Sequence, residues 1–334
     1  MNMKKILVIV CAFIALQAFA QDQKPVPQKV NNRYSVRLKP KDGGGYTVDS
    51  RTRELLGDAM PEDFLEPYSV VPVVPSSIIA DVPCQEIVYK KYGDREVKLF
   101  IAPAVGASEP TPVVCLIHGG GWSAGSPDGF AKRARYIAKF AGLAGVSIGY
   151  SLMQKDDSIT IEDTMNDLRD AVKYIKQHAK EFNIDPTRFA FAGHSAGGHL
   201  AALMAMTEPC AKVLSGWSGP YDLEVQMNYW TDGKKRTTQH YFLGMKASAV
   251  KKYSPIHVIP KKRQVAVQLF NGTCDPLVHH SQAENFAAAL EKAGQKTVEL
   301  LIYPYYGHGL NNTSDKNREC QDLFIQFVKA HIYD

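Results

Sequence analysis

The sequence lacks the features that mark several specialised classes of protein. Its 334 residues carry a formal net charge of only +5 at pH 7, which gives no support for binding to nucleic acid. The six cysteines form no Cys-x-x-Cys pair and no His-Glu-x-x-His motif occurs, so we expect no metal site. With 45% hydrophobic and 22% charged residues, the composition is that of an ordinary globular protein with a substantial core.

Long apolar runs are missing after the first twenty residues. Residues 1–20 carry lysines at positions 4 and 5, the apolar run Ile6–Leu16 and the small-x-small sequence Ala18–Ala20. This order is typical of a secretory signal peptide that is cleaved after Ala20. A membrane anchor is the weaker interpretation, because the run is shorter than the roughly 20 residues that span a bilayer. We therefore predict a periplasmic or secreted protein without stable insertion into a membrane.

Cysteine is scarce in the mature chain. Five cysteines would remain after cleavage, and although an oxidising compartment permits disulfides, an odd number leaves at least one thiol free. Cys115 lies inside the apolar run Val113–Ile117, so we expect an inert core residue there.

Composition divides the remaining chain into two parts. Residues 21–75 are rich in proline, lysine and glycine, which is typical of a linker or a loosely packed N-terminal arm. A partial cover over an active site is the alternative for this segment. Residues 76–334 are expected to form one domain.

Strand and helix patterns alternate along this domain. Glu86–Tyr92 and Glu96–Ala102 are joined by the turn signal Gly93-Asp94, which predicts an antiparallel hairpin. Val113–Ile117 follows as a continuous apolar run, which predicts a strand buried on both faces. Further strands are expected at Gly145–Tyr150, Arg188–Ala192, Val213–Trp217, Val265–Phe270 and Thr297–Tyr303, and helices at Lys132–Ala141, Thr160–Phe182, after Ser195, at His279–Ala293 and at Asp315–Ala330. This alternation predicts an α/β fold with a mostly parallel sheet covered by helices on both faces.

Two segments carry more specific expectations. In the helix Thr160–Phe182, apolar residues recur at spacings of three and four, and we expect Asp163, Asp167 and Asp170 on its other side to face solvent. The aromatic segment from Trp217 to about Pro260 shows no regular period, so we expect it to be irregular.

The rest of the chain is organised around the stretch Arg188–Met206. A buried strand leads into Gly193–Gly197, which has the Gly-x-Ser-x-Gly pattern, and an alanine-rich helix follows. Glycines on either side allow a sharp strand-to-helix turn to present the hydroxyl of Ser195. The N–H group of Ala196 would then point from the start of a helix, where donors favour a developing oxyanion. Ser195 is therefore the predicted nucleophile, although a serine that merely caps the helix would give the same local pattern.

Residues after other strands supply the partners that a nucleophilic serine needs. His118–Trp122, with three consecutive glycines, follows the buried strand and predicts an oxyanion loop rather than a flexible one. His308 lies in a glycine loop after the strand that ends near Tyr303, and Asp275 follows the strand that ends at Phe270. Because parallel sheets place their sites at the carboxyl ends of strands, we assign His308 as the base and Asp275 as the acid that orients it.

Rival residues are less favourably placed. Asp222 is the nearest alternative acid, and we expect it to cap the segment that follows it. His194 is expected to pack beside the serine turn. The other histidines considered lie on predicted helices or in irregular segments, where solvated or capping roles are expected: His178, His240, His257 and His331.

Four motifs in this order resemble those of α/β-hydrolases, in the branch of hormone-sensitive-lipase-like esterases and bacterial feruloyl and acetyl xylan esterases. They are His118–Trp122, Gly193–Ala202, Cys274–Val278 and Tyr306–Gly309, and the resemblance covers roughly residues 112–334. It implies an α/β-hydrolase fold, and a catalytic domain over residues 76–334. It also implies that the N–H groups of Gly120, Gly121 and Ala196 form the oxyanion hole.

The chain also departs from the lipase-like pattern. His194 and His199 stand where lipase-like members usually carry an acidic residue and an asparagine, which is similar to the carbohydrate-esterase and formamidase side of the branch. Ser151 stands where an arginine is common, and this weakens any analogy of substrate. The helical cap of lipase-like members has no obvious counterpart before Gln85.

These residues predict hydrolysis of carboxylic esters through an acyl-enzyme. Ser195 attacks the carbonyl, His308 transfers the proton and Asp275 fixes the imidazole tautomer, so neither a metal nor an organic cofactor is required. Because the imidazole must be neutral to accept a proton, activity should fall below about pH 6 to 7. An acetyl or feruloyl ester on a carbohydrate is the first candidate substrate. An aryl formamide or a short peptide is the alternative, and a binding module with an idle triad is a third interpretation.

Aromatic residues near strand ends suggest walls for an aryl or sugar substrate. The candidates are Trp122, Tyr150, Tyr221 and Tyr306. Ordinary core packing is an equally good interpretation for any one of them.

Overall fold

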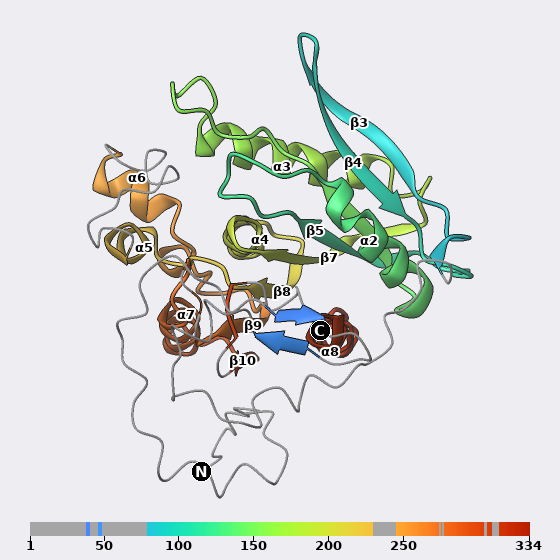
Figure 1. The fold of residues 1–334 in the computed structure, drawn as a ribbon. Helices are drawn as coiled ribbons and strands as arrows, with labels where there is room; N and C mark the ends of the chain where they lie inside the picture. Colours follow the sequence, from blue (N-terminus) through green and yellow to red (C-terminus); the bar gives the residue numbers. More distant parts are fainter. Residues whose placement is uncertain are drawn as a thin grey trace, which may run out of the picture.

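The computed structural model describes residues 79–229, 245–273, 275, 277–303, 306–308 and 314–334, and the backbone of two short paired strands, β1 (Leu38–Pro40) and β2 (Tyr46–Val48). Cys274, His240 and most of the predicted N-terminal arm lie outside these residues. Figure 1 shows a central sheet flanked by helices.

The sheet has eight strands in the order β10-β9-β8-β7-β5-β6-β4-β3. Its strands are β3 (Gln85–Tyr92), β4 (Arg95–Ala102), β5 (Thr111–Ile117), β6 (Ala144–Ile148), β7 (Ile184–His194), β8 (Ala211–Trp217), β9 (Ala266–Gly272) and β10 (Val298–Tyr303). β3 pairs antiparallel with β4, and β4 antiparallel with β6, while all other pairs are parallel. The predicted α/β architecture with an antiparallel N-terminal hairpin is therefore confirmed.

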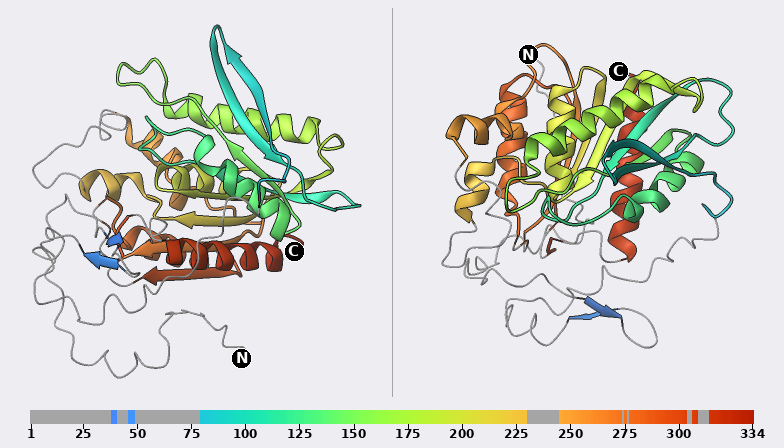
Figure 2. Two further views of the ribbon diagram at one scale, coloured as in Figure 1. Left: turned by 45° about the vertical axis from the view of Figure 1, so that its right-hand side comes forward. Right: turned by 90° about the horizontal axis from the view of Figure 1, so that it is seen from above.

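Helices cover both faces of this sheet (Figure 2). The bounds are α2 (Asp128–Phe140), α3 (Ile161–Gln177), α4 (Ala196–Thr207), α7 (Ser281–Lys292) and α8 (Ser314–His331). Residues of α3, α4 and α7 share one buried apolar cluster with one face of the strands, and residues of α2 and α8 share a second cluster with the other face. In β5, Cys115 faces the first cluster and Leu116 the second, as expected for a strand buried on both sides.

The segment that lacks a regular period is partly helical. It contains the short helices α5 (Leu223–Tyr229) and α6 (Ala247–Lys252) and the 3₁₀ turn η6 (Pro255–His257). The expectation of an irregular segment is wrong for these residues, because helices of one or two turns are too short to display a periodic pattern.

The expectation for the exposed side of α3 is also wrong at one residue. The side chain of Asp167 is fully buried. The hairpin β3–β4 packs on this side of the helix. Asp167 accepts a hydrogen bond of 2.6 Å from the Tyr92 hydroxyl and forms an ion pair of 2.8 Å with Lys90. Asp170 is partly exposed, as expected. α3 also ends at Gln177 rather than at Phe182.

The four cysteines in the described part of the chain, Cys84, Cys115, Cys210 and Cys320, are free thiols. Cys115 is buried in the core, as predicted. None of the described helices combines the length and the apolar character needed to cross a membrane.

Candidate active site

A sharp turn presents the hydroxyl of Ser195 between β7 and α4. Ser195 has a φ of +59°, in the left-handed region that a residue with a side chain seldom adopts. The turn needs glycines on both sides. A Cβ on Gly193 would lie 2.7 Å from the carbonyl oxygen of Ile117, and one on Gly197 would collide with the same oxygen. The Ser195 N–H donates to the Trp217 carbonyl at 2.8 Å, which fixes the strained residue to the next strand.

Three side chains from separate parts of the chain form a continuous hydrogen-bonded row. The Ser195 hydroxyl donates to Nε2 of His308 at 2.8 Å. The Nδ1–H group of His308 donates to Oδ2 of Asp275 at 2.8 Å. Asp275 follows β9, and His308 follows β10, so all three lie at the carboxyl edge of the parallel strands.

Asp275 is held rigidly at this edge. Its side chain is fully buried, and its second oxygen, Oδ1, accepts hydrogen bonds from the N–H groups of Leu277 at 2.8 Å and Val278 at 2.9 Å. The carboxylate is therefore fixed in orientation, with Oδ2 facing His308.

The glycine loop after β5 packs directly against the serine turn. A Cβ on Gly119 would lie 2.6 Å from the His194 carbonyl oxygen, so only glycine permits this approach. Gly120 and Gly121 have φ values of +124° and +59°. Within the described residues, the N–H groups of Gly120, Gly121 and Ala196 donate to no backbone carbonyl. Donors of this kind beside a nucleophile can bind a developing oxyanion.

A buried pair connects this loop to the helix that follows the serine. The indole N–H of Trp122 donates to Nδ1 of His199 at 3.1 Å, and Nε2–H of His199 donates to the Tyr253 carbonyl at 2.7 Å. Trp122 has a φ of +64°. Burial lowers the pKa of His199 to about 4, so the ring stays neutral and keeps Nδ1 free to accept. From the sequence, His199 was noted only as a departure from the lipase-like motif. No sequence pattern indicated its contacts with Trp122 and Tyr253.

Three of the four aromatic candidates for a substrate wall are core residues instead. Trp122 and Tyr150 are 2% and 5% exposed, and Tyr221 is fully buried. Tyr150 stacks on the His118 ring and Tyr221 stacks on Phe286. Tyr306 is half-buried, so of the four it alone has surface to offer a substrate.

The alternative candidates for the acid and the base make other interactions in the structure. Oδ1 of Asp222 accepts from the N–H groups of Glu224 and Val225 at 3.0 and 3.2 Å, which is the predicted capping role at the start of α5. His194 does pack beside the serine turn, with its ring 4.7 Å from that of His308. His178 bonds to the Tyr174 carbonyl on α3.

The guanidinium of Arg95 lies beside Ser151, the residue that stands where an arginine is common in the resembling esterases. Nη1 of Arg95 donates to Oγ of Ser151 at 2.5 Å, and Ser151 donates in turn to Asp167 through both its N–H and its hydroxyl group. The hairpin thus places a cation beside Ser151.

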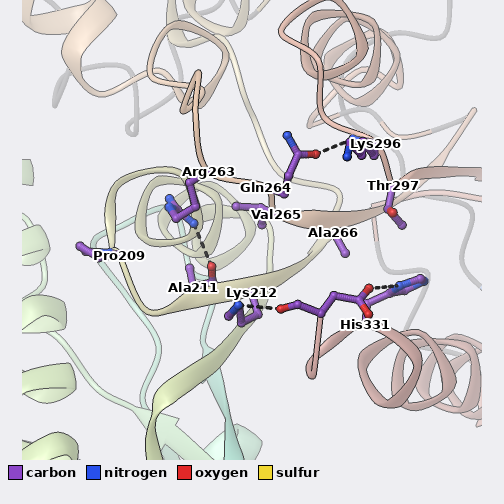
Figure 3. A pocket seen from close by; sticks show the side chains of 11 residues that line it. Pro209, Ala211, Lys212, Arg263, Gln264, Val265, Ala266, Lys296, Thr297 and His331 are labelled. Atoms are coloured by element: carbon purple, nitrogen blue, oxygen red, sulfur yellow. Dashed lines mark hydrogen bonds and ion pairs between the residues drawn. The ribbon is translucent and has the colours of Figure 1, made fainter.

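A cavity of about 470 Å³ lies at the opposite edge of the sheet. Figure 3 shows Lys212, Arg263 and His331 around it, next to the first residues of β8 and β9. Its polar groups are largely paired within the chain, for example Lys212 with the Asp334 carbonyl at 2.6 Å. The cavity is separate from Ser195, which lies at the other end of these strands. No cluster of three or more potential metal ligands occurs among the residues described.

The sequence matches a known family of esterases. Residues 100–290, more than half of the chain, match the BD-FAE family. The chain belongs to this family. The family is named for bifunctional feruloyl and acetyl xylan esterases and lies among the α/β-hydrolases. The match contains Ser195 and Asp275, and it ends before His308.

Curated relatives of this BD-FAE member include several esterases. An esterase of Gibberella moniliformis is 34% identical over 118 residues, which are 35% of this chain and 36% of the relative. The probable isoprenylcysteine alpha-carbonyl methylesterase ICME of Oryza sativa subsp. japonica is 27% identical over 255 residues, 67% of this chain and 58% of the relative. The matches span less than two thirds of both these proteins. The ethyl acetate hydrolase of Pseudomonas putida is 25% identical, over 70% of this chain and 77% of the relative.

Solved structures give the same fold. The apo form of Thermogutta terrifontis esterase 2 aligns with a TM-score of 0.61 and 25% identity, and the alignment covers 73% of this chain and 93% of that one. A butyrate-bound form of the same esterase also aligns with a TM-score of 0.61 and 25% identity, covering 75% and 94%. The predicted α/β-hydrolase fold is thus confirmed.

Proposed function

We propose that this protein is a serine esterase that uses Ser195, His308 and Asp275 to hydrolyse carboxylic esters through an acyl-enzyme. The observation that carries the proposal is the continuous row of hydrogen bonds from Ser195 through His308 to Asp275, with both spacings at 2.8 Å. Membership of the BD-FAE family supports the same reaction.

Each residue has a defined part in this mechanism. Nε2 of His308 removes the proton from Ser195 as its oxygen attacks the ester carbonyl, and returns that proton to the leaving alcohol. Asp275 keeps the proton of the neutral imidazole on Nδ1, which leaves Nε2 free to act as a base. The N–H groups of Gly120, Gly121 and Ala196 receive the negative charge that develops on the carbonyl oxygen. A water molecule then attacks the carbonyl of the acyl-enzyme and gives a proton to His308. His308 returns this proton to the Ser195 oxygen as the carboxylic acid leaves.

The substrate we propose is an acetyl or feruloyl ester of a carbohydrate. The family match supports this class. One relative is named an ethyl acetate hydrolase, and Thermogutta terrifontis esterase 2 has a butyrate-bound structure, which supports a short acyl group. We further propose that the mature protein is exported after cleavage behind Ala20. This second proposal is tested by sequencing the N-terminus of protein recovered outside the cytoplasm, which should begin at Gln21.

Activity of the purified protein tests the proposed reaction. We expect turnover of p-nitrophenyl acetate, methyl ferulate and acetylated xylo-oligosaccharides, and loss of about 10⁴- to 10⁶-fold in kcat for Ser195→Ala, as when other triads lose their nucleophile. A fluorophosphonate probe should label the wild type and leave Ser195→Ala unlabelled. Ser158→Ala, at an exposed loop serine, is the matched control and should behave as the wild type. Unchanged turnover in Ser195→Ala would refute the assignment, and preference for an aryl formamide would change the substrate class.

A further inference from the structure

His194 forms a hydrogen bond with the backbone of the residue that we assign as the base. Nε2–H of His194 donates to the carbonyl oxygen of His308 at 2.6 Å. The two rings lie 4.7 Å apart. His194 is the last residue of β7 and immediately precedes Ser195, so one side chain connects the serine turn to the loop that carries the imidazole.

The direction of this bond determines the state of the His194 ring. A carbonyl oxygen can only accept, so the proton must lie on Nε2 of His194. Burial and the neighbouring His308 lower the pKa of His194 to about 4. The ring is therefore neutral around neutral pH, and the bond adds no charge beside His308. An acidic side chain at this position could not donate to the carbonyl.

The described part of the loop that carries His308 is also attached to the two strands beside it. On the β9 side, the Tyr306 backbone lies directly on Gly272, at a spot that a Cβ on Gly272 would occupy. On the β10 side, the ring of Tyr306 contacts that of Tyr303. These two contacts hold the loop to β9, which precedes Asp275, and to β10, which precedes His308. His194 adds a bond from the end of β7, the strand that leads into Ser195, to the backbone of this loop.

We propose that His194 is a positioning residue, whose Nε2–H bond to the His308 carbonyl sets the separation between the His308 imidazole and the Ser195 hydroxyl. This inference rests on the proposed esterase function and assigns a further residue to it. Displacement of a reacting group by about 1 Å can cost about 10²-fold in rate, so loss of this bond should lower kcat more than it raises KM.

Two substitutions separate the hydrogen bond from simple packing. The side-chain nitrogen of glutamine lies as many bonds from Cα as Nε2 of histidine does, whereas that of asparagine corresponds to Nδ1. His194→Gln can therefore still donate to the His308 carbonyl, and His194→Asn cannot. We expect His194→Asn to lose about 10- to 100-fold in kcat with little change in KM, and His194→Gln to lose about tenfold less than that.

The assay measures kcat and KM with p-nitrophenyl acetate, together with the rate of fluorophosphonate labelling, on protein whose folded fraction is measured by thermal melting. His178→Gln is the matched control, because His178 also bonds a backbone carbonyl, through Nδ1 at 2.9 Å on α3, and glutamine would break that bond far from Ser195. It should leave kcat unchanged.

The outcomes distinguish this inference from the proposed function. A wild type that neither hydrolyses esters nor reacts with the probe refutes the proposed function and, with it, the role of His194. An active wild type with a fully active His194→Asn refutes the positioning role alone. Equal losses in His194→Gln and His194→Asn would show that packing, and not the hydrogen bond, matters.

Discussion

At the scale of single residues, Asp275 uses its two carboxylate oxygens for different purposes. Oδ1 accepts from two backbone N–H groups, and Oδ2 faces Nδ1 of His308. In Asp275→Asn, the amide oxygen would keep the backbone donors, so the amide nitrogen would point at His308.

That substitution should therefore invert the His308 tautomer. With an N–H donor facing Nδ1, the ring proton moves to Nε2, which can no longer accept from Ser195. We expect kcat to fall by about 10⁴-fold, as when other triads lose their carboxylate in this way, with little loss of stability. A pH–rate profile measures the fall in kcat, and a thermal melt measures the change in stability. A variant that keeps more than about a tenth of wild-type activity would contradict the role of Asp275.

Sequence position was sufficient to select the residues that the structure brings together. Ser195, Asp275 and His308 each follow a predicted strand, and the carboxyl ends of parallel strands meet at one edge. The same reasoning left both a pocket wall and core packing open for Trp122 and Tyr221, and the structure shows core packing. Sequence position could not decide between them, because an aromatic residue after a strand can face either a pocket or the core. The bond between Trp122 and His199 joins residues far apart in the chain, and no local pattern encodes such a contact.

At the scale of elements, the hairpin β3–β4 is attached to α3 through Asp167. This buried carboxylate accepts from Tyr92 and Ser151 and pairs with Lys90. The helix spacing correctly predicted which side carries the aspartates, but only the three-dimensional path of the hairpin determines that this side is covered. Burial of Asp167 could not be predicted for that reason.

Removal of this carboxylate should destabilise the protein strongly. In Asp167→Ala, the Tyr92 hydroxyl and the N–H and hydroxyl groups of Ser151 lose their acceptor, which costs about 3 to 5 kcal/mol of unfolding free energy. Asp170→Ala is the matched control: Asp170 pairs with the same Lys90 at 2.5 Å, but its side chain is 44% exposed, so we expect a loss of about 0 to 1 kcal/mol. Urea unfolding at pH 7 measures both. Equal losses in the two variants would show that burial of Asp167 is not the cause.

At the scale of the whole molecule, neutral histidines in the core make the fold sensitive to acid. Burial lowers the pKa values of His118, His194 and His199 in the folded protein. Their unfolded forms bind protons more readily, so the unfolded state gains protons as pH falls below the ordinary histidine value. Stability is thus fully present above that value and is lost as pH decreases.

His199 allows this effect to be measured. Its pKa falls from 6.5 to about 4 on folding, so lowering the pH from 7 to 5 should remove about 2 kcal/mol of unfolding free energy through this group. His199→Asn keeps an acceptor for Trp122 and has nothing to titrate. We expect its unfolding free energy to depend less steeply on pH between 7 and 5, whatever its value at pH 7. Parallel curves for wild type and variant would contradict the assigned pKa.

The surroundings of Ser195 also provide an optical signal. Trp217 accepts the Ser195 N–H through its carbonyl, and Trp122 bonds to His199 in the first turns of the following helix. These are two of only three tryptophans in the chain, and both indoles are buried. Intrinsic fluorescence is therefore weighted toward the carboxyl ends of β5 and β8, and a red shift of the emission will report water entering the packing at this edge of the sheet without any attached dye.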